Sequence, residues 1–213
     1  MLVSVSSMPA GKDACQYAKQ IENFADFFHC DVCDGQYNQT ICFSPELAQQ
    51  VNNCSTIPLD CHLMTKSPLS FAQKYIASGA NIVTSQIESL DDKAQIEQFV
   101  HFVKQNHALV GLSIEPKTSV VAVLPYLKDI DIVLVMSVKT GLSGQKFDES
   151  VLSKVEYLSK LRASEKLNYK IEVDGGINDK VAKLVKQVGA DVVVSGNFVF
   201  FADDKKKAIE SLR

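Results

Sequence analysis

The chain has 213 residues, of which 46% are hydrophobic and 22% are charged, so it can bury one large apolar core and is expected to be globular. Its formal net charge of -3 gives no basic surface for the phosphates of nucleic acid, and we expect no nucleic-acid partner. No run approaches the roughly 18 apolar residues of a membrane span, and residues 1–9 lack the charged start of a secretory leader, which indicates a cytoplasmic protein with no membrane partner.

Apolar runs alternate with amphipathic segments along the whole chain, beginning with a strand at residues 2–6 and a helix at residues 13–24, where apolar residues recur at helical spacing. Ser-Pro pairs at 44–45 and 67–68 indicate two further helix starts, because Ser caps a helix and Pro suits its first turn. The expected strands span residues 2–6, 27–32, 57–62, 81–85, 108–114, 131–136, 169–173 and 191–195. The expected helices span residues 13–24, 44–51, 67–78, 90–106, 117–127, 147–163, 178–188 and 203–212.

These segments make eight consecutive strand–helix units with no residues left over for a second unit of structure. Eight alternating units in one chain of this size favour a closed parallel barrel over an open doubly wound sheet. We therefore predict an α/β fold with a single domain over residues 1–213, a (β/α)8 barrel. In such barrels the catalytic side chains gather at the carboxyl ends of the strands.

Residues 27–35 contain the second expected strand, which carries His29 and Asp31 on one face, because alternate residues of a strand share a face. A single His-x-Asp pair is a weak motif and is more often a hydrogen-bonded structural pair. Two other expected strands end in His62 and in Asp174, however, at the same rim. Together the four groups offer the mixed nitrogen and oxygen donors that suit a divalent transition ion.

The six cysteines are Cys15, Cys30, Cys33, Cys42, Cys54 and Cys61. A chain long enough to build its own core has no need of disulfides, so we expect all six to be thiols. Cys30 and Cys33 form a C-x-x-C motif, which is typical of redox and zinc sites. On a strand, however, these two side chains face opposite sides, which argues against both uses.

Two carboxylates beside one cation suit proton transfer at a carbon next to a carbonyl. The cation stabilises the oxyanion as the proton leaves, and each carboxylate can act as base or acid on its own side. If Asp31 and Asp174 face opposite sides of a flat enediolate, removal of the proton on one side and its return on the other inverts the carbon, and no redox cofactor is required.

Loops after the last three strands have the character of a phosphate site, because unobstructed backbone amides bind phosphate and such barrels hold it after strands seven and eight. The candidate residues are Gly141, Leu142, Ser143 and Gly144 after the sixth strand, Gly175 and Gly176 after the seventh, and Gly196 and Asn197 after the eighth. Glycines after strands are mostly turn formers, so each loop alone is a weak signal. Together the three loops favour a sugar phosphate.

Several motifs in the same order resemble the ribulose-phosphate 3-epimerase family along nearly the whole chain. The matching stretches are HCDVCDG at 29–35, PLDCHLM at 58–64, MSV at 136–138 with Gly141 and GQ at 144–145, IEVDGG at 171–176 and GAD at 189–191. The resemblance implies a (β/α)8 barrel and one divalent ion (Zn, Fe, Mn or Co) held by His29, Asp31, His62 and Asp174. It also implies that Asp31 and Asp174 are the acid and base pair.

The resemblance further implies a small-molecule substrate, a ketose phosphate, and a homo-oligomer. The substrate would contact His62, Met64 and a serine at the end of the first strand, for which we choose Ser6, while a small shift would select Ser4.

Departures from the family pattern fall on the substrate side and leave the metal ligands intact. The family usually has Met at Cys33, His at Gln86 and Ser at Asn197, and Asn-Pro at Lys139 and Thr140. These changes question which sugar is used more than which reaction is catalysed.

Three interpretations follow. The first is 3-epimerisation of D-ribulose 5-phosphate to D-xylulose 5-phosphate. The second keeps the chemistry with D-allulose 6-phosphate or a related hexulose phosphate, because residues 43–45, 50–51 and 59–62 also resemble that branch. The third is a sugar-phosphate-binding barrel without turnover.

Overall fold

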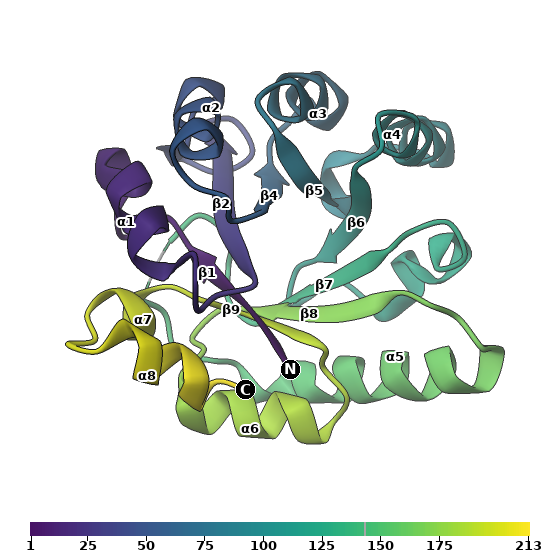
Figure 1. Ribbon diagram of the computed structural model, residues 1–213. Helices are drawn as coiled ribbons and strands as arrows, with labels where there is room; N and C mark the ends of the chain where they lie inside the picture. The colour runs from purple at the N-terminus through teal and green to yellow at the C-terminus, as the bar shows by residue number, and fades with distance from the viewer. Residues whose placement is uncertain (143) are drawn as a thin grey trace.

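The computed structural model describes residues 1–142 and 144–213, and its parallel strands close into one barrel (Figure 1). The strands are β1 (Leu2–Ser6), β2 (Phe27–Asp34), β4 (Leu59–Met64), β5 (Ala80–Gln86), β6 (Leu109–Ile114), β7 (Ile132–Met136), β8 (Lys170–Asp174) and β9 (Val192–Ser195). Each strand pairs in parallel with the next, and β1 closes the ring by pairing with both β2 and β9. The predicted (β/α)8 barrel is confirmed.

Helices surround the ring of strands on its outside (Figure 1). They are α1 (Ala14–Ile21), α2 (Pro45–Cys54), α3 (Pro68–Ala77), α4 (Lys93–Gln105), α5 (Leu152–Glu165), α6 (Asp179–Gln187), α7 (Asn197–Phe200) and α8 (Lys205–Ser211). The predicted cap of α2 is present, because the Ser44 side chain accepts a hydrogen bond from the Leu47 amide at 3.3 Å. No helix in the described part of the chain combines the length and apolarity needed to cross a membrane.

Three local features differ from the sequence-based expectations. The helix expected at residues 117–127 is wrong, and two 3-10 turns stand there, at Val120–Ala122 and Leu124–Tyr126. Pro125 explains the difference, because it lacks a backbone donor and disfavours the α conformation of the residue before it. The structure also adds the short helix α7 and a two-residue strand β3 (Ile41–Cys42), which pairs antiparallel with β2.

A disulfide joins Cys15 of α1 to Cys54 of α2, so the expectation that all six cysteines are thiols is wrong for this pair. The two helices follow neighbouring strands of the barrel and pack side by side, which brings the two Cα atoms to 6.3 Å. Cys30, Cys33, Cys42 and Cys61 are thiols within residues 1–142.

Changing both Cys15 and Cys54 to serine is expected to lower the free energy of unfolding by about 3 to 4 kcal/mol, because the disulfide closes a loop across a sequence separation of 39 residues. Urea unfolding with and without reductant measures this. The parent should lose stability on reduction while the double variant does not respond. Six titratable thiols in the untreated, denatured protein would contradict the bond.

The strands separate an apolar outer face from an inner face that carries buried polar residues. Val5 and Phe28 point outward into the hydrophobic core beneath the helices. The intervening residues Ser4, His29 and Asp60 are fully buried inside the barrel. Burying polar groups is costly unless they are hydrogen-bonded or charge-compensated, so this polar interior indicates a site.

Candidate functional site

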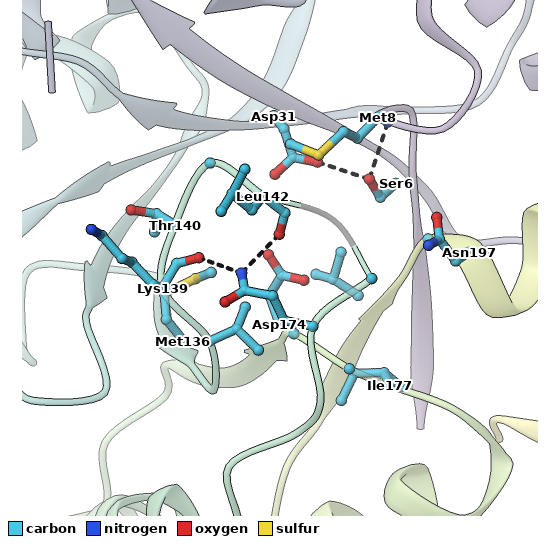
Figure 2. Close-up of a pocket in the computed structure, with 18 of the residues that line it drawn as sticks. Ser6, Met8, Asp31, Met136, Lys139, Thr140, Leu142, Asp174, Ile177 and Asn197 are labelled. Carbon is cyan, nitrogen blue, oxygen red and sulfur yellow. Dashed lines mark hydrogen bonds between the residues drawn. The ribbon is translucent and has the colours of Figure 1, made fainter. Parts of the chain in front are cut away.

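A cavity of about 340 Å³ opens at the carboxyl ends of the strands (Figure 2). Asp31 and Asp174 lie at its floor with Met136, and the loop after β7 forms one wall (Figure 2). The predicted substrate residues that line it are Ser6, Met64, Gly141, Leu142, Gly144, Gly175, Gly176, Gly196 and Asn197. Ser143 lies outside the described residues. His62, which was also predicted to contact a substrate, is fully buried and is not among the residues that line the cavity.

The four predicted ligands converge at this mouth. His29, Asp31, His62 and Asp174 each offer one donor atom, and these atoms all lie within 4.8 Å of one another. The register of the sheet brings two of them together, because Asp31 and His62 are direct partners across β2 and β4. Asp174 comes from the end of β8, on another side of the ring. Asp31 and both histidines are buried, and Asp174 is half-buried.

The electrostatics of the cluster favour a positive charge at its centre. Burial, followed by the charge of Asp31, raises the pKa of Asp174 to about 7. Burial and the neighbouring His29 lower the pKa of His62 to about 3, so this imidazole is neutral at physiological pH. A divalent cation would compensate the negative charge of the two close carboxylates, and a neutral imidazole can serve as its ligand.

Two ring nitrogens support the same interpretation. Within the described chain, His29 Nε2 and His62 Nδ1 are buried and have no hydrogen-bond partner. Buried polar groups in folded proteins nearly always have partners, so these two unpartnered nitrogens call for a ligand. The donor set of two imidazole nitrogens and two carboxylates fits a divalent transition ion.

A second polar layer lies next to the cluster, deeper in the barrel. Asp60 accepts a hydrogen bond from His29 Nδ1 at 2.8 Å and another from the Ser4 hydroxyl at 2.8 Å. The contact at Nδ1 leaves Nε2 of His29 for the cluster. Burial and the adjacent Asp60 raise the pKa of Glu172 well above its usual range, which favours its neutral form. Both acids were missed, although each lies two residues before a predicted ligand on the same strand face.

The choice between the two serines of β1 is decided by depth in the barrel. Ser6 donates a hydrogen bond to Asp31 Oδ2 at 2.8 Å and lines the cavity (Figure 2). Ser4 bonds to Asp60 in the deeper layer. Ser6 is thus the serine of β1 that lines the cavity and contacts Asp31.

Side-chain hydrogen bonds hold the loop after β7 together and attach it to neighbouring segments. Gln145 Nε2 donates to the carbonyl oxygens of Lys139 at 2.7 Å and Leu142 at 2.9 Å (Figure 2). The Thr140 hydroxyl donates to Glu115 at 2.6 Å, and Thr40 donates to the carbonyl oxygen of Gly141 at 2.8 Å. Lys139 and Thr140, two of the departures from the family pattern, therefore shape the wall of the cavity.

Two glycines allow the backbone to turn sharply after β8, beside the cavity. Gly175 and Gly176 have φ angles of +114° and +63°. A Cβ on Gly176 would lie 2.4 Å from the backbone nitrogen of Phe147, so no side chain fits there. The backbone of this loop is left open toward the cavity, as a phosphate site requires.

In the metal-free protein, Asp174→Asn is expected to raise the thermal midpoint at pH 8 and to have a smaller effect at pH 5. The folded-state pKa of Asp174, about 7, exceeds its ordinary value of 3.8, so this group stabilises the fold below pH 4 and loses that contribution as pH rises through 7. Asparagine stays neutral throughout. Thermal melts at both pH values measure the difference, and an equal shift at both would contradict the raised pKa.

Comparisons with known proteins point to one family. A family model described as the ribulose-phosphate 3 epimerase family matches residues 2–200. The chain is 33% identical over 190 residues to the ribulose-phosphate 3-epimerase of Bacillus subtilis strain 168, a match that covers 89% of this chain and 86% of that protein. It is 34% identical over 203 residues to the protein of the same name from Helicobacter pylori strain J99, with 94% and 92% covered.

Solved structures share the fold. A 3-keto-L-gulonate-6-phosphate decarboxylase from Vibrio cholerae superposes with a TM-score of 0.73 at 14% identity, over 100% of this chain and 95% of that one. A 3-hexulose-6-phosphate synthase gives a TM-score of 0.72 at 15% identity, over 100% and 98%. At such low identities these two likenesses show the barrel alone.

Proposed function

Because the chain belongs to the ribulose-phosphate 3-epimerase family, whose members are isomerases that act on carbohydrates, we propose that it epimerises a ketose phosphate at C3 with a divalent metal ion. The substrate we propose is D-ribulose 5-phosphate, converted to D-xylulose 5-phosphate. The observation that carries this proposal is the convergence of His29, Asp31, His62 and Asp174. Of these four residues, Asp31 and Asp174 line the cavity.

The metal would be held by Nε2 of His29, Nδ1 of His62 and one oxygen each from Asp31 and Asp174. This mixed donor set suits Zn, Fe, Mn or Co. When bound, the ion supplies a positive charge that stabilises the oxyanion formed as the substrate loses its C3 proton.

The protein's own side chains move the proton. Asp31 and Asp174 come from β2 and β8, which lie on different sides of the ring, and both line the cavity. With the substrate between them, one carboxylate removes the C3 proton and the other, in its acid form, returns a proton to the opposite face. The hydrogen bond from Ser6 keeps Asp31 oriented toward the cavity.

The phosphate would lie away from the floor, against the loops after β7, β8 and β9. Gly144, Gly175, Gly176 and Gly196 leave their backbones unobstructed there, and Asn197 adds a side-chain amide. These loops are where (β/α)8 barrels commonly hold phosphate. Lys139 in the same wall supplies a positive charge at the rim.

Comparing kcat/KM for D-ribulose 5-phosphate and D-allulose 6-phosphate, with the ion reconstituted, tests the proposed substrate. We expect the pentulose phosphate to be preferred and its product to be D-xylulose 5-phosphate. A preference for the hexulose phosphate would keep the chemistry and replace the substrate. Tight binding of either compound without turnover would favour the sugar-phosphate-binding barrel.

A further inference from the structure

The imidazole of His62 contacts a buried amide on the side away from Asp31 and Asp174. Gln86 ends β5, and its Nε2 atom lies 3.1 Å from Nε2 of His62. Both residues are fully buried. Because Nε2 of His62 contacts Gln86, Nδ1 is the ring nitrogen left for the metal cluster.

This contact has two possible hydrogen-bonding arrangements. They differ in whether Nδ1 of His62 presents a proton or a lone pair to the metal cluster. A neutral imidazole carries one ring proton, and an amide presents two donors on nitrogen and an acceptor on oxygen. If the amide nitrogen of Gln86 donates to Nε2, the ring proton sits on Nδ1 and faces the cluster. If the amide is turned over, its oxygen accepts from Nε2–H, and Nδ1 presents a bare lone pair.

Two unpaired atoms favour the second arrangement. In residues 1–142 and 144–213, neither Nδ1 of His62 nor Oε1 of Gln86 has a hydrogen-bond partner. Turning the amide over gives the oxygen its partner, places the amide nitrogen at the unpartnered position, and leaves the Nδ1 lone pair of His62 free for a ligand. The orientation of an amide is an assignment, and a metal ligand at Nδ1 requires the turned form.

We propose that Gln86 is a positioning residue that accepts the Nε2–H hydrogen bond of His62 and so presents Nδ1 to the metal. His29 is held in the opposite sense, with Nδ1 on Asp60 and Nε2 toward the cluster. The two imidazoles thus meet one ion through different nitrogens, each fixed by its own partner. This inference rests on the proposed metal-dependent function. The tautomer of His62 that it predicts is also a property of the metal-free protein.

The first test is the tautomer of His62 in the metal-free parent protein, read from nitrogen-15 chemical shifts and ring couplings in NMR spectra. We expect a single neutral tautomer with its proton on Nε2. The Gln86→Leu variant removes the acceptor at similar volume and should lose this preference. The Gln86→Glu variant retains an acceptor oxygen and should keep it.

The second test is the affinity for Zn²⁺, measured by competition with a chromophoric chelator. Gln86→Leu should weaken binding by about 10- to 100-fold, the usual cost of losing an outer partner of a metal ligand, and Gln86→Glu should restore it. Gln95→Leu makes the same substitution on the exposed face of α4 and should leave the Zn²⁺ affinity unchanged. Thermal melts show which variants are folded. If Gln86→Leu does not fold, the NMR spectrum of the parent protein still decides the tautomer of His62.

A proton on Nδ1 in the metal-free parent, or parental Zn²⁺ affinity in a folded Gln86→Leu variant, would overturn the proposal. A different experimental result would contradict the proposed function. A protein that shows the expected tautomer and the expected loss of affinity, but does not epimerise any ketose phosphate, would retain this inference and lose the function.

Discussion

Asp174→Asn is expected to lower the rate of epimerisation by about 10³-fold, because asparagine can neither accept nor return the C3 proton. Asp174 suits this role by its position, because it ends β8 and lines the cavity. The amide oxygen still offers a metal ligand. The loss should therefore appear in kcat, with the metal content close to that of the parent.

Asp179→Asn is the matched control for this experiment. Asp179 begins α6, five positions along the chain from Asp174 and outside the cavity lining, so its replacement should leave kcat unchanged. Initial rates with D-ribulose 5-phosphate and metal analysis of both variants give the comparison. An Asp174→Asn protein that keeps more than about a tenth of the parental rate would show that Asp174 is not the acid or base.

His29→Ala is expected to have the second largest effect, a loss of Zn²⁺ affinity greater than the roughly 100-fold that losing an outer partner can cost. The substitution removes a ligand and also leaves Asp60 without its imidazole donor, although the Ser4 hydroxyl still bonds to it. Epimerisation should fall with the bound metal and recover in part at high metal concentration.

His101→Ala serves as the control for that substitution, since His101 lies exposed on α4 and belongs to no part of the cluster. Metal content after dialysis, Zn²⁺ competition and the epimerisation rate should match the parent in this variant. Full metal affinity in His29→Ala, with the fold intact by thermal melt, would remove His29 from the ligand set.

The sequence was sufficient for the barrel because its pattern repeats. Eight apolar runs separated by amphipathic segments leave few alternatives, and β7, with five buried residues in a row, is typical of a strand covered on both faces. The same pattern places His29, Asp31 and Asp174 near strand ends, where parallel strands present their side chains to one mouth.

The depth of a residue inside the barrel could not be derived from the repeating pattern of the sequence. Alternation assigns a residue to the inner face, but the register between strands sets its height, and a single sequence does not specify that register. Ser4 and Ser6 both face inward, and only the structure shows that Ser6 bonds to Asp31 and lines the cavity. Asp60 and Glu172 were missed for the same reason.

Contacts between distant segments were also beyond the sequence. The Cys15–Cys54 disulfide depends on how α1 packs against α2, and the Gln86–His62 contact depends on the angle between β5 and β4 inside the ring. The antiparallel strand β3 has only two residues and gives no periodic signal. Assembly into a homo-oligomer stays a prediction.

Deuterium uptake at C3 of D-ribulose 5-phosphate in heavy water, followed by NMR with metal-loaded and metal-free protein, tests the whole account most directly. The loaded protein should place a deuteron at C3 of both ribulose 5-phosphate and xylulose 5-phosphate, and the metal-free protein should place none. Exchange that is equally fast after complete metal removal, or a loaded protein that leaves C3 fully protonated, would contradict a two-aspartate reaction centred on one cation.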